Sequence, residues 1–156
     1  MKKPFLPIMA TVLLAIHPFT AAGAERLVPS QHPTIQAAVD AASSGDTIRI
    51  AAGEYSEQAF VRSKQLSIIG DPGAVLHAHS EMKRTPWNEN VPIFGFERAT
   101  VVVSNLVLEG NLMGDYYPEG RFLGIIFRSS SGRIENCAIR GFRATSDLQV
   151  RAINVK

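Results

Sequence analysis

Apolar and polar positions change period within the first third of the chain. Ile35, Ala38, Val39 and Ala42 follow the i, i+3, i+4, i+7 spacing of one helix face, which predicts a helix over 34–42. The period then becomes two in the segment TIRI at 47–50, which predicts a strand. Because the helix is short and its apolar face is small, it must dock on other elements, and the strand that follows is the nearest.

A looser repeat runs through the rest of the chain. The segments QLSIIG at 65–70, NLVLEG at 105–110 and NCAIRG at 136–141 share an amide residue, alternating apolar positions and a final glycine. A weaker echo relates GIIFR at 124–128 to AINVK at 152–156. Short strands that recur at similar intervals predict the coils of a solenoid. A plain β-sandwich is the alternative, although the tight hairpin turns that a sandwich needs are not evident.

The repeat makes specific predictions about packing. Alternate side chains of each coil would point into a stacked core, and the amides would lie at a turn where they hydrogen-bond from coil to coil. The expected inward columns contain Leu66, Leu106 and Cys137, and Ile68, Leu108 and Ile139; the expected stacked amides are Gln65, Asn105 and Asn136.

The N-terminal residues have the order of a secretory signal. Lys2 and Lys3 precede an apolar stretch over 5–16 that is too short for a comfortable membrane span, and small residues follow at 22–24. This order predicts a signal peptide over 1–24, a domain over 25–156, and a secreted or periplasmic location without membrane contact after cleavage. A retained N-terminal anchor is the alternative.

Charge and cysteine content narrow the classes of function. The chain has 16 basic and 14 acidic residues, and loss of Lys2 and Lys3 would balance them. No dense basic run remains, so a nucleic-acid partner is not expected. The single cysteine excludes an intrachain disulfide, and Cys137 is interpreted as a small buried apolar residue.

The stretch VPSQHPTIQAAVDAASSGDTIRIAAGEYSE, followed by KQLSIIGDPGAVL, resembles the N-terminal part of right-handed parallel β-helix proteins of the pectin lyase-like superfamily. PTIQAAVDAA and AAGEY are similar to the opening of pectin methylesterases. The resemblance implies an all-β, right-handed parallel β-helix whose first coil is capped by the short α-helix. It covers 27–76 closely and 100–156 more loosely. Because the opening motif contains the capping helix, it is interpreted as structural and not as a catalytic signature.

The family's catalytic motifs do not occur in the sequence. Neither an Asp-Phe-Ile-Phe-Gly pattern nor a Tyr-Gly-Asp-Pro-His pattern is present, so the resemblance assigns no catalytic residue. Because AINVK ends within an apparent strand, the sequence is expected to hold the first coils of a longer β-helix. Self-association through an open C-terminal edge is the alternative.

Two long predicted loops contain the candidate site residues, because loops on a rigid scaffold often bind ligands. Aromatic residues could stack on sugars and arginines could neutralise uronates, which makes Trp87, Tyr116, Tyr117 and Arg84 the substrate-binding candidates. Paired carboxylates serve acid–base chemistry on polysaccharides, so the catalytic candidates are Asp115, Glu119 and Arg121. The candidate metal ligands are His77, His79 and Glu81. For each group, loop residues without a ligand role are the alternative.

The sequence therefore predicts an exported β-helix domain that binds a polysaccharide or a cell-surface glycan, without a complete active site of its own. No cofactor is evident, and calcium is the candidate ion. A polysaccharide lyase, pectin esterase or uronate epimerase with catalytic coils beyond Lys156 is one alternative. A surface adhesin or self-assembling module is the other.

Overall fold

The computed structural model describes residues 23–86, 89–117, 121–143 and 151–155, and within them the protein is all-β with one α-helix. Helix α1 spans Ile35–Ala41, as the apolar spacing predicts. The Thr34 hydroxyl caps it by accepting a hydrogen bond from Ala37 N at 3.0 Å. Ile35, Ala38 and Val39 are buried, so the predicted apolar face is the face that docks.

The described strands form three sheets in which the paired strands are parallel. The first sheet contains β1 (Glu25–Val28), β2 (Thr47–Ile50), β5 (Gln65–Gly70), β8 (Thr100–Ser104) and β11 (Ser131–Glu135). The second contains β3 (Gly53–Tyr55), β6 (Ala74–His77), β9 (Val107–Glu109) and β12 (Ala138–Arg140). The third contains β4 (Ala59–Arg62), β7 (Val91–Glu97), β10 (Phe122–Arg128) and β13 (Arg151–Val155).

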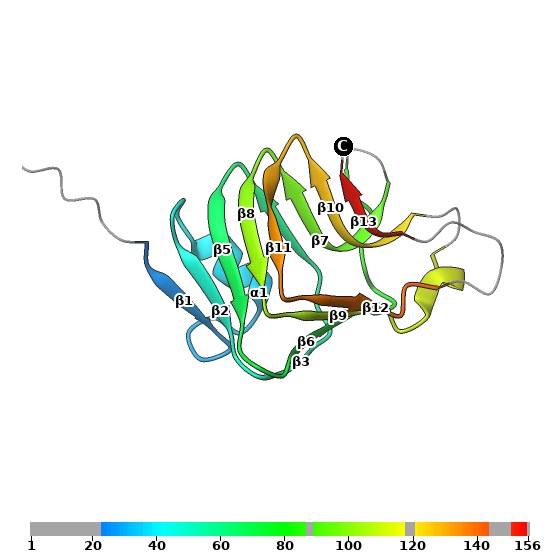
Figure 1. Cartoon of the computed structure of the whole chain (residues 1–156), viewed down its shortest axis with the longest axis horizontal. Helices are drawn as coiled ribbons and strands as arrows, with labels where there is room; N and C mark the ends of the chain where they lie inside the picture. Colours follow the sequence, from blue (N-terminus) through cyan, green and yellow to red (C-terminus); the bar gives the residue numbers. More distant parts are fainter. Residues whose placement is uncertain (1–22, 87–88, 118–120, 144–150, 156) are drawn as a thin grey trace, which may run out of the picture.

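From β2 onward the chain visits the first, second and third sheet in that order and then begins again. We call one such passage a round, and Figure 1 shows successive rounds stacked from the end that carries α1. A β-sandwich of antiparallel hairpins is therefore excluded for the described strands. Strand β1, which the sequence pattern did not predict, extends the first sheet beyond β2.

Apolar residues from all three sheets meet in one core. Ile48 pairs with Ile68, Ile68 with Val103, and Val103 with Ile134, which gives one column along the first sheet. The second sheet stacks Leu76 on Leu108 and Leu108 on Ile139. The third sheet stacks Phe94 on Ile125 and Phe96 on Phe127. These registers bury the apolar face of each round on its neighbours, and α1 packs beside β1, β2 and β4 at one end.

The structure corrects the predicted repeat in one respect. QLSIIG is strand β5 of the first sheet, whereas 105–110 and 136–141 contain β9 and β12 of the second sheet. Ile68 therefore stacks on Val103 and not on Leu108. The repeat between 105–110 and 136–141 is confirmed by the pairing of Leu108 with Ile139. The echo between 124–128 and 152–156 is confirmed by the pairing of Ile125 with Ile153.

Two of the three corners in each round are short, and most of these short corners contain a residue with positive φ. Asn105 and Asn136 follow the first sheet with φ of 57° and 50°, and Gly73 precedes β6 with φ of 95°. Gln65 is not part of this corner, because it begins β5. Ser63, Arg98 and Ser129 repeat the left-handed conformation at the corner after the third sheet. The third corner, between the second and third sheets, carries the long loops.

Candidate functional site

We call the segments 78–90 and 110–121, which connect the second sheet to the third, the loop corner. Gln58 fixes its first segment with a side-chain amide that pairs with the backbone of Lys83. Its Oε1 accepts from Lys83 N at 2.8 Å, and its Nε2 donates to Lys83 O at 2.9 Å and to Pro92 O at 2.7 Å. The middle of this segment is thus held beside the start of β4.

Tyr117 joins the two segments of the loop corner. Its hydroxyl donates to His79 O at 2.5 Å and accepts from Met82 N at 3.2 Å, and its ring stacks on Phe122 with centroids 5.5 Å apart. Burial raises the pKa of this phenol above its usual value, so the hydroxyl keeps its proton at neutral pH. Tyr117 therefore orders the loops, which was the alternative to a ligand role.

Tyr116 has the opposite environment. Its side chain is 58% exposed, and its ring meets Tyr117 edge to face with centroids 5.0 Å apart. The neighbouring 3-10 turn, Met113–Asp115, places Tyr116 directly after it. An aromatic ring is thus presented to solvent from a loop that Tyr117 anchors.

Glu89, which sequence reasoning did not single out, joins the two arginines of the loop corner. One carboxylate oxygen, Oε2, lies 3.3 Å from Arg84 Nη1 and 2.5 Å from Arg121 Nη1. Glu89 has a left-handed backbone with φ of 58°. The predicted uronate-neutralising side chains are therefore brought together, but around a carboxylate of the protein itself.

The two candidate histidines have different partners. His77 Nδ1 lies 3.3 Å from Asn111 Oδ1, and its buried Nε2 lies 3.8 Å from Glu54 Oε2. His79 Nδ1 instead accepts from Glu81 N at 3.3 Å. Among the described residues, no three His, Cys, Asp or Glu side chains are grouped so that they could hold a metal ion.

The structure describes only two of the four remaining candidate residues. Asp115 is exposed at the end of the 3-10 turn, and Arg121 binds Glu89. Glu119 and Trp87 lie outside the described residues, as does 1–22 of the predicted signal peptide. The proposed pairing of Asp115 with Glu119 therefore stays a prediction.

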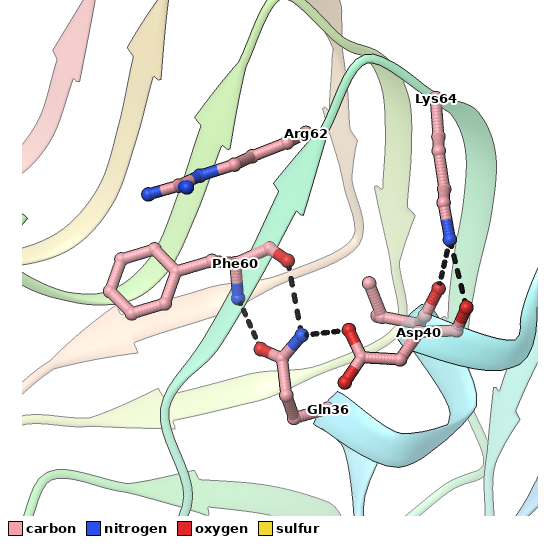
Figure 2. Close-up of a pocket in the computed structure, with 6 residues that line it drawn as sticks. Gln36, Asp40, Phe60, Arg62 and Lys64 are labelled. Atoms are coloured by element: carbon pink, nitrogen blue, oxygen red, sulfur yellow. Dashed lines mark hydrogen bonds between the residues drawn. The ribbon is translucent and has the colours of Figure 1, made fainter.

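A hollow lies where α1 meets β4, with a volume of about 320 Å³. Figure 2 shows Gln36, which lines this hollow, hydrogen-bonded to the backbone of Phe60. Gln36 Oε1 accepts from Phe60 N at 2.7 Å, and Gln36 Nε2 donates to Phe60 O at 3.3 Å and to Asp40 Oδ1 at 2.7 Å. β4 is the edge strand of its sheet, so this amide takes the place of a neighbouring strand.

The ends of α1 are also held by side chains from other elements. Glu57 Oε2 accepts from Ile35 N at 2.7 Å, and burial raises the pKa of this carboxyl, although the Ile35 and Gln36 N–H groups oppose that shift. At the other end, Lys64 Nζ donates to Val39 O at 2.7 Å and to Asp40 O at 3.1 Å. Glu57 and Lys64 therefore fix the two ends of α1 to the strands beside it.

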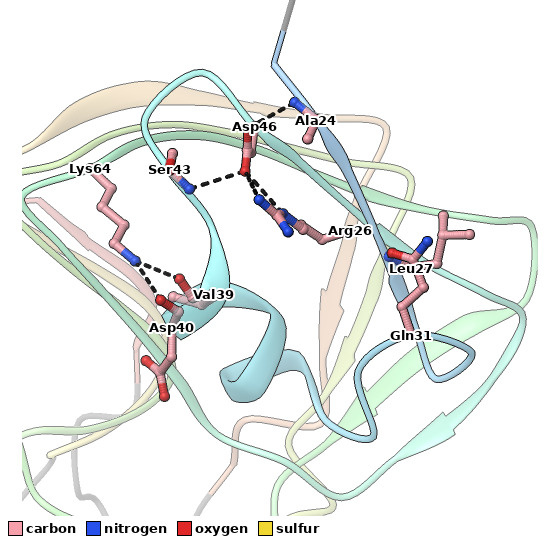
Figure 3. A network of polar contacts seen from close by, with 9 residues as sticks. All are labelled: Ala24, Arg26, Leu27, Gln31, Val39, Asp40, Ser43, Asp46 and Lys64. Carbon is pink, nitrogen blue, oxygen red and sulfur yellow. Dashed lines mark hydrogen bonds and ion pairs between the residues drawn. The ribbon is translucent and has the colours of Figure 1, made fainter.

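Asp46 is the centre of a polar network beneath β1 (Figure 3). Its side chain is only 6% exposed. Oδ1 accepts from Ala24 N at 2.8 Å, and Oδ2 accepts from Ser43 N at 3.0 Å and from Arg26 Nε at 3.0 Å. The two N–H groups, followed by Arg26, hold the pKa of Asp46 below its usual value.

Sequence periodicity gave no signal for four side chains of these networks, because each has a partner that is distant in sequence. They are Gln36, Asp46, Glu57 and Glu89.

In the part of the chain that the structure describes, no helix has the length and apolar character needed to cross a membrane. The molecule belongs to the class of all-β proteins built from parallel sheets. Comparison with protein-family models, curated proteins and solved structures finds no match to this chain.

Proposed function

We propose that this chain is an exported right-handed parallel β-helix of the pectin lyase-like type, and that its loop corner binds a polysaccharide. The fold part of the proposal is supported by three parallel sheets visited in a fixed cyclic order and by a helix whose apolar face covers one end of the core. Such a helix is needed because the first round of stacked strands would otherwise expose apolar side chains and unpaired backbone groups.

The exposed ring of Tyr116 is the observation that carries the binding proposal. Tyr116 is exposed beside Tyr117, which is fixed by two hydrogen bonds and by Phe122. Aromatic rings that are held in place offer large apolar contact area with little loss of side-chain freedom on binding. A sugar ring with an apolar face is a suitable partner for such a surface.

The arginines suggest how charge would affect binding. Because Glu89 already bridges Arg84 and Arg121, the carboxylate of a uronate would compete with it. Acidic polysaccharides are therefore expected to gain less binding free energy from Arg84 and Arg121 than they would from two guanidinium groups without a carboxylate partner. Calcium can bridge carboxylates of sugar and protein, so its effect is part of the test.

The test is a binding assay of the chain against polygalacturonate, alginate and a neutral glucan, with calcium or with a chelator. Tyr116→Ala is expected to weaken binding by about threefold to tenfold, as expected for loss of one aromatic stacking contact. Leu112→Ala is the matched control, because Leu112 is a non-aromatic apolar residue of the same loop that is 63% exposed. Equal binding by the wild type and Tyr116→Ala would reject the proposal.

A further inference from the structure

The first described residues are part of the fold and not an appendage to it. Ala24 N donates to Asp46 Oδ1 at 2.8 Å, and Ala24 O accepts from Thr47 N at 2.9 Å. Gly23 lies so close to the backbone of Gly45 that a Cβ on it would be 1.7 Å from Gly45 O. Ala24 therefore contributes both of its backbone polar groups to the start of the first sheet.

The two oxygens of Asp46 have separate partners. Oδ2 binds Ser43 N and the Arg26 guanidinium, whereas Oδ1 faces Ala24 N. The side chain is nearly inaccessible to water, so a donor lost from Oδ1 would leave a buried acceptor without that partner. Such a loss is destabilising, and more so for a charged group.

We propose that Asp46 binds the α-ammonium group of a processed chain that begins at Ala24. The inference rests on the proposed export of the protein. An export peptidase would add water across the Gly23–Ala24 peptide bond, leaving a carboxylate on Gly23 and an ammonium on Ala24. The nitrogen that now donates to Asp46 would then carry a full positive charge at the same position.

This proposal moves the expected cleavage point by one residue. Cleavage after Ala24 would remove the hydrogen bond to Asp46 and the acceptor of Thr47 N. Cleavage after Gly23 would keep both, and Ala21 and Gly23 supply small residues in the same relation to the cut as Ala22 and Ala24 do. It would also replace a neutral N–H donor to the Asp46 carboxylate with an ammonium, so that the hydrogen bond becomes an ion pair, which is stronger.

Sequencing the N-terminus of the exported protein is the first test. A chain that begins with Ala24 is the expected result. A chain that begins with Glu25 or any later residue overturns the proposal, even if export and polysaccharide binding are both confirmed. A chain that still begins with Met1 overturns it together with the proposed export.

A second test needs neither export nor polysaccharide. The chain 24–156 is released from a fusion partner by a protease that leaves Ala24 as the first residue, and it is compared with the same chain acetylated on its α-amine. Acetylation is expected to lower Tm in the wild type and to have a much smaller effect in Asp46→Asn. Equal shifts in the two backgrounds would show that Asp46 does not recognise the ammonium.

Reactivity of the α-amine covers the case in which Asp46→Asn does not fold. In the wild-type chain 24–156, the amine is expected to react with an acylating reagent more slowly in the folded protein than in urea. A chain that begins at Glu25 is the matched control. Equal rates in the folded and unfolded chain 24–156 would overturn the proposal.

Discussion

The side-chain amide of Gln36 gives the sharpest test of how the helix-capped end is stabilised. It offers the edge strand β4 one acceptor and one donor, at 2.7 Å from Phe60 N and 3.3 Å from Phe60 O. These are the two contacts that a peptide group of a neighbouring strand would make. We expect Gln36→Ala to destabilise the protein because the backbone groups of Phe60 lose both partners.

The magnitude follows from the environment of those groups. A neutral hydrogen bond contributes about 0.5–1.5 kcal/mol, and a buried group left without a partner costs about 1–3 kcal/mol. The Phe60 groups are partly buried, so water can replace some of the loss. Alanine also favours the helix by a few tenths of a kcal/mol. We therefore expect Gln36→Ala to lower the free energy of unfolding by about 1–2 kcal/mol.

Urea unfolding monitored by circular dichroism measures this difference, with the m-value checked for constancy. Gln31→Ala is the matched control, because Gln31 makes one exposed hydrogen bond with Leu27 N at 3.1 Å. Gln58→Ala should behave like Gln36→Ala, since Gln58 pairs with the Lys83 backbone in the same way. If Gln36→Ala and Gln31→Ala lower the free energy of unfolding equally, the idea that the Gln36 side-chain amide takes the place of a neighbouring strand is refuted.

Three further predictions concern the same scaffold. Thr34→Ala removes the cap from α1 and should cost about 1 kcal/mol in urea unfolding, whereas Thr34→Ser should retain most of the stability. Gly132→Ala would place a Cβ 1.8 Å from Val101 O and should lower the free energy of unfolding by about 1–3 kcal/mol; a loss no greater than that of the exposed variant Arg133→Ala would contradict the register of β8 and β11. The pKa of Asp46 is lowered in the folded state. Its contribution to the free energy of unfolding is therefore present at pH values above its ordinary pKa of 3.8 and is lost as the pH falls through the folded-state pKa. The pKa of Glu57 is raised in the folded state. Its contribution to the free energy of unfolding is therefore present at pH values below its ordinary pKa of 4.5 and is lost as the pH rises through the folded-state pKa. Thermal unfolding between acidic and neutral pH should show a weaker acid-side loss in Asp46→Asn and a weaker neutral-side loss in Glu57→Gln, and unchanged pH profiles would refute both assignments.

Local patterns predicted the elements whose packing depends on nearby residues. The face formed by Ile35, Ala38 and Val39 could be read from helical spacing, and TIRI at 47–50 could be read from alternation. The repeat at 105–110 and 136–141 could also be found, because both segments turn at an asparagine with positive φ before their strands in the second sheet.

The error in the repeat has a physical cause. A strand followed by glycine occurs at the end of β5 as well as after β9 and β12, so the pattern marks a bend without saying which corner it is. The long segment 78–90 also lengthens one round, and this hides the true partner of β9, which is β6.

The candidate site was only partly predictable. Composition drew attention to the loop corner and to Tyr116, Tyr117, Arg84 and Arg121. It did not indicate that Glu89 would bridge the two arginines or that the hydroxyl of Tyr117 would tie together segments 35 and 38 residues apart. Such contacts depend on how two loops fold against each other, and no period in the sequence records that.

From β2 onward, the long connections between the described strands leave the second sheet and return to the third, whereas the other two corners keep nearly constant length. Residues inserted into these connections would lengthen a round without changing the register of any strand pair. The three parallel sheets can therefore stay the same while the surface residues of this corner change. For a protein engineer, this corner is the place to graft new sequence.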